Sequence, residues 1–279
     1  MTGREAAEIC NRYGITARKR WGQNFLCSEE ISDRIVSAAE ISKDDSILEI
    51  GPGIGALTRK LCEKAERFLA IEIDPILVAC LQDQLIDSTE CPVICADYLK
   101  LHTDRIVDCI GRPQVLVSNL PYNLTTPIIT KLITDFSDST TMVFMVEEDA
   151  CDRIFAQPSD KAYGVLSIIT SAFGKKEKLF IVSPNHFFPS PHTSSAVIRF
   201  SREKGRAPIP SGFVSFVRDA TAARRKTLLN ALHQSLKYSD DVQRIKNFLA
   251  GRHLAENCRA ETLTPDEFLA LYRQLASDS

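Results

Sequence analysis

The sequence predicts an α/β fold: a doubly wound parallel sheet within residues 1–203, followed by a smaller all-helical C-terminal domain over residues 204–279. Three observations lead to this prediction. From about residue 28 to residue 200, short apolar strands alternate with amphipathic helical segments, as in parallel sheets covered by helices. The stretch "SREKGRAPIPS" (201–211) is charged and contains proline and glycine, as linkers between domains do. Beyond it, apolar residues recur only at helical spacing.

The first part of the predicted sheet is entered through a helix. Ser28 can cap this helix, and Glu29 and Glu30 in its first turn suit the positive end of the helix dipole. Strands and helices then alternate, and each strand is a short apolar run. The predicted elements are a strand at 46–50, a helix at 57–64, a strand at 67–73, a helix at 75–85 and a strand at 92–96.

The fourth strand is the apolar run 113–117, and it leads into the unusual sequence "SNLPYN" (118–123). After it, Thr126 is expected to be an N-cap and Pro127 the first residue of a helix, a position that proline favours. The rest of the domain is expected to contain a strand at 141–146, a helix holding 151–155, an apolar segment at 165–173, and strands at 178–182 and 195–200.

The C-terminal domain is expected to consist of helices alone. Its apolar residues form three stripes at helical spacing, within 213–220, 228–236 and 242–249. The last helix has the clearest start, because Thr264 and Glu267 can form a capping box around Pro265. Leu263 and Phe268 flank this box and can form a hydrophobic staple.

The composition indicates a globular protein. Of the 279 residues, 44% are apolar, which is enough to fill a sizeable core, and 25% are charged. No apolar run approaches the roughly 20 residues that span a bilayer, so we expect a soluble, cytoplasmic chain. The nine cysteines contain no C-x-x-C pair, which favours reduced thiols over disulfides or zinc. His186 and His192 lack a cluster of partner ligands, so no metal site is expected.

The net charge of -2 conceals an asymmetry. Residues 201–279 contain 13 Lys and Arg against 9 Asp and Glu, a charge of +4, which leaves -6 on the first 200 residues. Two compact basic clusters stand out: 18–20 beside Trp21, and 224–226. Such clusters are candidates for contact with nucleic acid, although many are simply solvated surface.

A glycine-rich turn predicts a nucleotide-type cofactor. In "EIGPGIGALT" (49–58), Gly51 follows the first strand, and two further glycines allow the backbone to approach a ligand closely. The second strand ends near Glu72, 21 residues after Gly51, where a carboxylate can accept both hydroxyls of a ribose. The third strand ends at Asp97, which can accept from the amino group of an adenine.

These features suit either a dinucleotide or S-adenosylmethionine, because both contain an adenosine. A pyrophosphate requires the helix N-terminus directly beneath it. The turn "GPGIG", with Pro52, departs from the G-x-G-x-x-G spacing of dinucleotide sites. The pattern therefore favours S-adenosylmethionine.

The tip of the fourth strand predicts a site for adenine. Pro121 has no N–H and pushes Leu120 toward an extended conformation, so the backbone carbonyls near Asn119 and Leu120 cannot all be bonded within a ladder. Asn119 adds a side-chain carbonyl and Tyr122 a flat ring. Accepting both hydrogens of an adenine amino group favours a pyramidal nitrogen whose lone pair can attack. Methyl transfer then requires mainly alignment, and no general base is assigned.

These motifs resemble the KsgA-type small-subunit rRNA adenine dimethyltransferases, which use S-adenosylmethionine to dimethylate two adjacent adenosines near the 3′ end of that RNA. The resemblance covers nearly the whole chain and implies a Rossmann-like methyltransferase sheet with a helical C-terminal domain. The matching motifs are "GQNFL" (22–26), "EIGPGIGALT" (49–58), "IEID" (71–74), "AD" (96–97), "NLPYN" (119–123), "KAYGVLS" (161–167), "FFPSPHTSSAV" (187–197) and "RRKTLLNAL" (224–232).

The resemblance implies a role for each site residue. The cofactor-binding residues would be Asn24, Leu26, Gly51, Glu72, Asp97 and Asn119. The target adenine would be held by Asn119, Leu120 and Tyr122, with Phe187 stacking on its opposite face. The family pattern F-x-P-P-P is here "FFPSP", which leaves open whether Phe187 or Phe188 stacks.

The resemblance also implies partners. Arg224, Arg225 and Lys226 would contact the phosphates of small-subunit rRNA within an immature 30S-type particle, and the enzyme would act as a monomer.

Three alternatives remain: a large-subunit methyltransferase of the macrolide-resistance class, a non-catalytic nucleic-acid-binding relative, and a nicotinamide oxidoreductase. The C-terminal motifs disfavour the first, the intact cofactor residues the second, and the turn spacing with "SNLPYN" the third.

Overall fold

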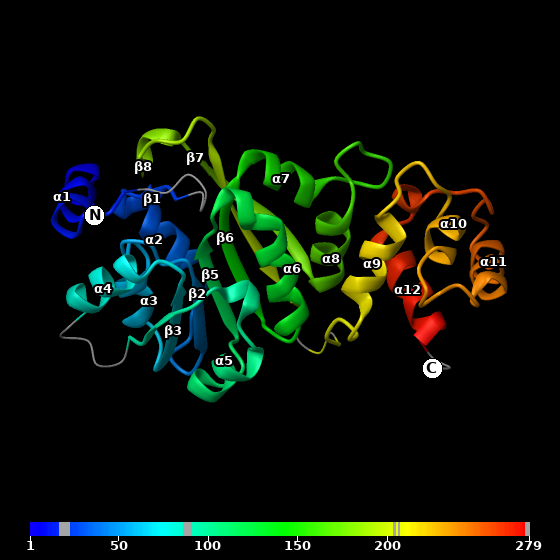
Figure 1. Ribbon diagram of the computed structural model, residues 1–279, viewed down its shortest axis with the longest axis horizontal. Coiled ribbons are helices and arrows are strands. Elements are labelled where there is room, and N and C mark those ends of the chain that lie inside the picture. The colour runs from blue at the N-terminus through cyan, green and yellow to red at the C-terminus, as the bar shows by residue number, and fades with distance from the viewer. Residues whose placement is uncertain (17–22, 86–90, 203–204, 206, 277–279) are drawn as a thin grey trace. The chain divides into compact units, whose positions relative to one another are not determined.

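The computed structural model describes residues 1–16, 23–85, 91–202, 205 and 207–276 (Figure 1). Within these residues, the central sheet has seven strands that lie in the order β4-β3-β2-β5-β6-β9-β7. The predicted strands match the observed ones to within two residues at either end, except that β7 begins three residues before the predicted position. The strands are β2 (Ser46–Ile50), β3 (Arg67–Glu72), β4 (Val93–Cys95), β5 (Val115–Asn119), β6 (Thr141–Glu147), β7 (Lys175–Val182) and β9 (Ser195–Ser201).

The direction of the strands differs from the prediction at one edge of the sheet. Strands β2 to β6 pair in parallel, with β2 between β3 and β5. Strand β9 lies between β6 and β7 and is antiparallel to both, so the expectation of a wholly parallel sheet is wrong there. The loop 183–194 that joins β7 to β9 contains no α-helical crossover, which parallel neighbours usually require.

A second, two-stranded sheet was not predicted. It pairs β1 (Phe25–Leu26) with β8 (Phe187–Phe188) in the antiparallel sense, and Leu26 lies opposite Phe187. Strands of two residues have no periodicity that a sequence pattern can reveal. This small sheet joins the "GQNFL" segment to the loop between β7 and β9.

Seven α-helices lie within residues 3–155 of the described chain, between or before the strands of the sheet. Helices α1 and α5 were not predicted, whereas α3 and α4 match the predicted helices to within two residues at either end. These helices are α1 (Gly3–Tyr13), α2 (Glu29–Ala38), α3 (Thr58–Cys62), α4 (Pro75–Gln84), α5 (Thr103–Ile110), α6 (Thr125–Asp135) and α7 (Glu148–Phe155).

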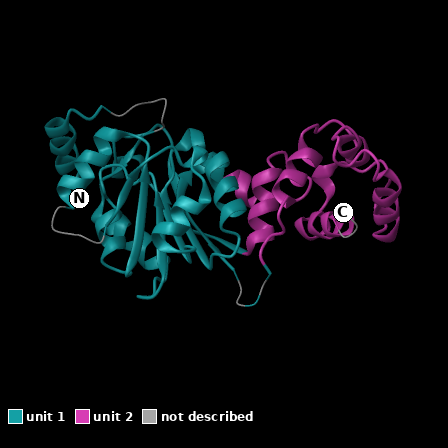
Figure 2. Ribbon diagram, turned by 60° about the horizontal axis from the view of Figure 1, so that its bottom comes forward, with its two compact units in different colours: residues 1–151, 175–207 teal, residues 152–174, 208–279 magenta. Residues whose placement is uncertain are grey.

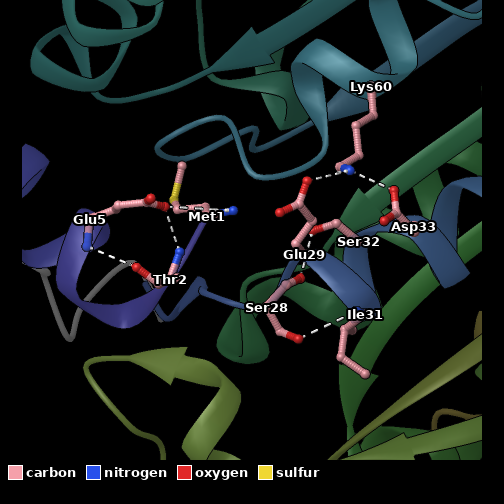
Figure 3. A network of polar contacts seen from close by, with 9 residues as sticks. All are labelled: Met1, Thr2, Glu5, Ser28, Glu29, Ile31, Ser32, Asp33 and Lys60. Atoms are coloured by element: carbon pink, nitrogen blue, oxygen red, sulfur yellow. Dashed lines mark hydrogen bonds and ion pairs between the residues drawn. The ribbon is translucent and has the colours of Figure 1, made fainter.

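Side-chain caps begin α1 and α2, as Figure 3 shows. The predicted cap Ser28 is confirmed, because its hydroxyl accepts a hydrogen bond from the Ile31 N–H at 3.4 Å. Lys60 of α3 lies 3.4 Å from the Glu29 carboxylate and 2.5 Å from that of Asp33, so it pairs with the N-terminal half of α2. These contacts hold α2 and α3 together on one face of the sheet.

The core on this face follows from the alternation of strand residues. Val115 and Val117 of β5 and Val143 and Met145 of β6 point to the same side and are buried with residues of α2 and α3. Because successive side chains of a strand face opposite ways, one face receives every second residue. The apolar runs of the sequence thus fill both faces of the sheet.

The start of α6 differs from the prediction. A 3-10 turn, η3 (Tyr122–Leu124), runs directly into α6, which begins at Thr125 rather than after a Thr126 cap. The Thr125 hydroxyl donates back to the carbonyls of Pro121 at 3.3 Å and Tyr122 at 3.2 Å. Pro127 is tolerated inside the first turn because the N–H groups there have no partner within the helix.

The chain forms two compact units (Figure 2). Unit 1 contains residues 1–151 and 175–207, and unit 2 contains residues 152–174 and 208–279. The predicted division at 203/204 thus differs from these units chiefly in the segment 152–174, because the apolar helix α8 (Val165–Phe173) packs against α9 (Phe213–Thr221) and α12 (Pro265–Ala276). The linker pattern in the sequence marks where the chain finally leaves unit 1. It does not show that the earlier segment 152–174 also belongs to unit 2. Residues 203 and 204 themselves lie outside the described residues.

Unit 2 is helical, as predicted, and has an aromatic core. Phe216 of α9 contacts Phe268 and Tyr238 edge to face, with ring centroids 6.4 Å and 5.3 Å apart. The predicted capping box of α12 is confirmed: the Glu267 carboxylate accepts from the Thr264 N–H at 2.7 Å, and the Thr264 hydroxyl accepts from the Glu267 N–H at 3.2 Å. The other helices of this unit are α10 (Leu228–His233) and α11 (Val242–Gly251).

The cysteines depart from the expectation of reduced thiols at one pair. Cys62 and Cys91 form a disulfide, with Cα atoms 5.8 Å apart, so the expectation is wrong for these two. Cys62 is the last residue of α3 and Cys91 precedes β4, and the fold places them side by side although they are 29 positions apart in sequence. Among the described residues, no helix is long and apolar enough to cross a membrane.

Candidate active site

One cavity opens where strands β2, β3 and β5 end, at the carboxyl edge of the parallel strands. Its space amounts to about 960 Å³, including its open mouth. Ligands of open α/β sheets bind at this edge, because the loops that follow parallel strands converge there. The cavity is lined by the candidate residues Asn24, Leu26, Gly51, Glu72, Asp97, Asn119, Leu120 and Tyr122.

The glycine turn forms one wall of the cavity. Gly53 has a φ of +60°, a conformation that favours glycine, and a Cβ on it would lie 3.1 Å from the Phe25 ring. Its N–H donates to Oε2 of Glu72 at 3.1 Å. The turn is therefore held to the end of β3 through a carboxylate.

Glu72 is a buried acceptor within a ring of N–H groups. Its Oε1 accepts from the N–H of Ile73 at 2.8 Å and of Asp74 at 3.0 Å, besides the bond from Gly53 to Oε2. Burial raises the pKa of Glu72, and these backbone hydrogen bonds oppose the shift. A carboxylate has about four acceptor positions, so Oε2 keeps capacity for a ligand hydroxyl.

Glu49 is a site residue that the sequence reasoning missed. It is 1% exposed and lines the cavity. Burial raises its pKa to about 8, the nearby Thr58 hydroxyl opposes this shift, and the Glu72 charge adds to it. Among the described residues, neither its Oε2 nor the buried Thr58 hydroxyl has a hydrogen-bond partner of ordinary geometry. A carboxyl at the end of a buried strand, two residues before the glycine turn, was the signal available in the sequence.

Asp97 serves partly as a cap. Its Oδ1 accepts from the Leu99 N–H at 3.0 Å and starts the 3-10 turn η2 (Tyr98–Lys100), while Oδ2 lies 3.5 Å from the Lys100 ammonium. It lines the cavity beside Ala96. Its expected role as an adenine acceptor stays a prediction.

Asn119 ends β5 with its amide in a defined orientation. The Asn119 Nδ2 donates to the backbone carbonyl of Asn24 at 3.0 Å. Because the amide nitrogen is engaged there, the amide oxygen is the group left to accept a hydrogen bond from a ligand. The Leu120 N–H donates to the Met145 carbonyl at 3.0 Å and is the last bond between β5 and β6. The strand-tip acceptors thus lie beside the "GQNFL" segment.

Tyr122 lies past the strand tip in the turn η3. Its ring lines the cavity, and its hydroxyl lies 2.5 Å from that of Ser195. Burial raises the pKa of Tyr122, and the Ser195 bond opposes this in part, so the phenol stays neutral at physiological pH. The ring is therefore a neutral platform in the cavity wall.

The phenylalanine expected to stack on the target is buried. Phe187 is 5% exposed and packs in the core beside Leu26, whereas Phe188 is 37% exposed. Among the described residues that line the cavity, neither ring is present. The role of Phe187 stays a prediction, and the accessible ring of the pair is Phe188.

Alanine substitution should separate the two rings by stability. Phe187→Ala removes a core side chain, and we expect the free energy of unfolding to fall by about 3–5 kcal/mol. Phe188→Ala should lower it by less, about 1 kcal/mol, because that residue is 37% exposed and its loss leaves no enclosed cavity. Urea denaturation of both variants checks this. A loss of kcat in Phe188→Ala at unchanged stability would assign the stacking role to Phe188.

The basic cluster of unit 2 contains one structural arginine. The Arg224 guanidinium donates to the Lys161 carbonyl at 2.7 Å and lies 3.7 Å from the Glu261 carboxylate. It thereby holds the "KAYGVLS" segment against the C-terminal helices. Arg225 and Lys226 are exposed, and Lys226 donates to the Gln234 side chain at 2.6 Å. The other cluster, Arg18, Lys19 and Arg20 with Trp21, lies outside the described residues.

Among the described residues, no group of three or more His, Cys, Asp and Glu side chains is placed to hold a metal ion. The site offers instead buried carboxyls, an oriented amide and an aromatic ring around one cavity. This chemistry suits a polar, cationic small molecule next to a planar base.

The sequence matches a family model described as ribosomal RNA adenine dimethylase over residues 14–276. Ribosomal RNA small subunit methyltransferase A of Alkaliphilus oremlandii is 37% identical over 279 residues, which cover 98% of this chain and 96% of that protein. The protein of the same name from Geobacillus sp. is 38% identical over 276 residues, covering 96% and 94%.

Solved structures share the fold. A dimethyladenosine transferase from Plasmodium falciparum has a TM-score of 0.68 at 23% identity, over 88% of this chain and 95% of that one. The 23S rRNA methyltransferase ErmE has a TM-score of 0.63 at 23% identity, over 90% and 99%. The cavity at the carboxyl edge of the sheet, with its oriented amide, is consistent with the family match over nearly the whole sequence. The chain belongs to the ribosomal RNA adenine dimethylase family.

Proposed function

We propose that this chain transfers methyl groups from S-adenosylmethionine to the exocyclic amino groups of two adjacent adenosines near the 3′ end of small-subunit rRNA. The observation that carries the proposal is the cavity in which the glycine turn after β2 meets the tip of β5. Family membership supports the RNA substrate. The substrate would be a late, immature 30S-type particle in the cytoplasm, met by a monomer.

The cavity residues suit this cofactor. Its methionine part carries an ammonium group, and Glu49 offers an unpartnered, buried carboxyl oxygen. Its ribose carries two hydroxyls, and Glu72 keeps acceptor capacity beside the glycine turn. Asp97 would accept from the adenine, and Asn24, Leu26 and Gly51 would form the remaining wall. When bound, the cofactor supplies a methyl group on a positively charged sulfur.

The strand tip would prepare the target. Asn119 presents its amide oxygen because its amide nitrogen is bonded to Asn24, and the Leu120 carbonyl would be the second acceptor. Two acceptors on one amino group orient its lone pair, and Tyr122 would support the face of the base. A base must leave its stack to reach this tip, at a cost of about a few kcal/mol. The rest of the acceleration would come from alignment.

One assay tests the proposal. The protein is incubated with S-adenosylmethionine carrying a radioactive methyl group and with immature small subunits, naked small-subunit RNA or large-subunit RNA, and the label is mapped. We expect dimethyladenosine in small-subunit particles. Label in large-subunit RNA would overturn the substrate, and cofactor binding without transfer would favour a binding factor.

The basic cluster leads to a separate prediction. Arg225→Ala should weaken RNA binding, because its exposed guanidinium would contact a phosphate. The slope of log K against the logarithm of the salt concentration should become shallower by about one. Arg224→Ala should instead lower the melting temperature, because its carbonyl partners in unit 2 are lost. Filter binding at several salt concentrations and thermal denaturation measure the two effects. Arg273→Ala, another exposed arginine of unit 2, is the control. RNA affinity indifferent to salt would contradict this assignment.

A further inference from the structure

The hydrogen bond between Tyr122 and Ser195 links the site to a part of the sheet that the mechanism does not otherwise use. The two hydroxyl oxygens lie 2.5 Å apart, although 73 residues separate them in sequence. Ser195 is fully buried, and it is the first residue of β9. A buried hydroxyl requires a partner, and this one is directed to the aromatic ring of the cavity.

The two residues differ in how firmly their backbones are held. Tyr122 lies in η3, beyond the last bond between β5 and β6. Ser195 lies in β9, which is paired on both sides, and in register it faces Glu147 of β6 and Val182 of β7. The hydrogen bond therefore connects the hydroxyl end of the Tyr122 side chain, which lies in a turn, to β9, a strand inside the sheet.

Ser195 also ends the loop that follows β7. This loop contains Phe187 and Phe188, and its last residues are fixed by a bond from the Thr193 hydroxyl to the Glu147 carboxylate at 2.7 Å. One hydroxyl thus connects the Tyr122 ring with the loop that contains the phenylalanine expected to stack on the base. Neither Thr193 nor Ser195 lines the cavity among the described residues, so Ser195 acts through Tyr122.

We propose that Ser195 is a positioning residue for methyl transfer, whose hydroxyl fixes the Tyr122 ring at the angle needed to support the target base. The inference rests on the proposed function and adds a residue to it. A ring that tilts lets the amino nitrogen move off the line of attack, and misplacements of this kind lower turnover strongly. Cofactor binding does not involve this ring edge, so its affinity is unaffected.

A double-mutant cycle tests the proposal with single-turnover methylation of small-subunit particles. We expect Ser195→Ala and Tyr122→Phe each to lower kcat roughly tenfold, and the double variant to lower it no further, since both remove one bond. The KM for RNA and the Kd for S-adenosylmethionine should stay within about twofold of the wild type. Tyr122→Phe leaves β9 intact, so the test does not depend on the folding of Ser195→Ala.

Ser139→Ala is the matched control. Ser139 is also buried, and its hydroxyl donates to the Pro113 carbonyl at 2.6 Å at the amino-terminal end of the parallel strands. It should lose stability without a change in kcat. If the wild type is active and both single variants keep its kcat, or if their losses multiply in the double variant, the role of Ser195 is overturned while the proposed function stands. A wild type that binds cofactor but transfers nothing overturns both.

Discussion

Asn119→Ala is expected to lower kcat by roughly 100-fold or more and to weaken S-adenosylmethionine binding as well. The Asn119 amide oxygen is the oriented acceptor at the strand tip, and removing one preorganised polar group of this kind costs about that factor. The same side chain lines the cavity between the cofactor residues and the tip. Its loss should therefore affect both ligands.

Tyr122→Ala should separate the two effects. In the proposed function the ring supports the target base, so kcat should fall strongly while the Kd for S-adenosylmethionine changes by less than about threefold. Calorimetric cofactor binding and single-turnover kinetics on both variants make the comparison. Asn123→Ala is the control, because Asn123 is an exposed amide of the same loop that does not line the cavity. Equal cofactor affinity in Asn119→Ala and Tyr122→Ala would contradict this division of roles.

Glu49→Gln is expected to change how stability depends on pH. Burial raises the folded-state pKa of Glu49 from 4.5 to about 8, so the folded protein keeps this proton over a range in which the unfolded chain releases it. The stability that this group contributes is fully present below pH 4.5 and is lost as pH rises to about 8. Over that window the loss is about 1.4 kcal/mol per pH unit.

Glutamine does not titrate, so the variant should gain stability relative to the wild type as pH rises. Urea denaturation at pH values near 5 and 8 measures the difference, which we expect to favour Glu49→Gln by about a few kcal/mol at the higher pH. Glu63→Gln, at an exposed position, should show no such trend. A difference that does not grow with pH would show that Glu49 is ionised in the folded protein.

The same carboxyl should respond to the cofactor. An ammonium group beside the unpartnered Oε2 favours the charged form, so binding should release up to about one proton near neutral pH. Calorimetry in buffers of different ionisation enthalpy measures this release. We expect it to disappear in Glu49→Gln together with part of the affinity. Unchanged proton release in the variant would assign the proton to another group.

The predicted elements and the observed ones agree where local pattern decides. Ser28 and the box of Thr264 and Glu267 cap their helices as expected, since capping involves residues three positions apart. The pattern failed where distant segments meet. The pairing of β1 with β8 and the insertion of β9 between β6 and β7 depend on long-range contacts that no local period encodes.

The candidate site shows the same division. The sequence by itself placed Gly51, Glu72 and Asn119 at the ends of the first, second and fourth predicted strands, and parallel pairing brings such ends to one edge, so their convergence followed from periodicity alone. Only the tertiary structure decided which groups are buried there, how the Asn119 amide is oriented, and which ring of the phenylalanine pair faces solvent. Burial and hydrogen-bond partners depend on what the rest of the chain packs against each residue. For that reason Glu49 and Ser195, whose proposed roles depend on their surroundings, were recognised only in the folded protein.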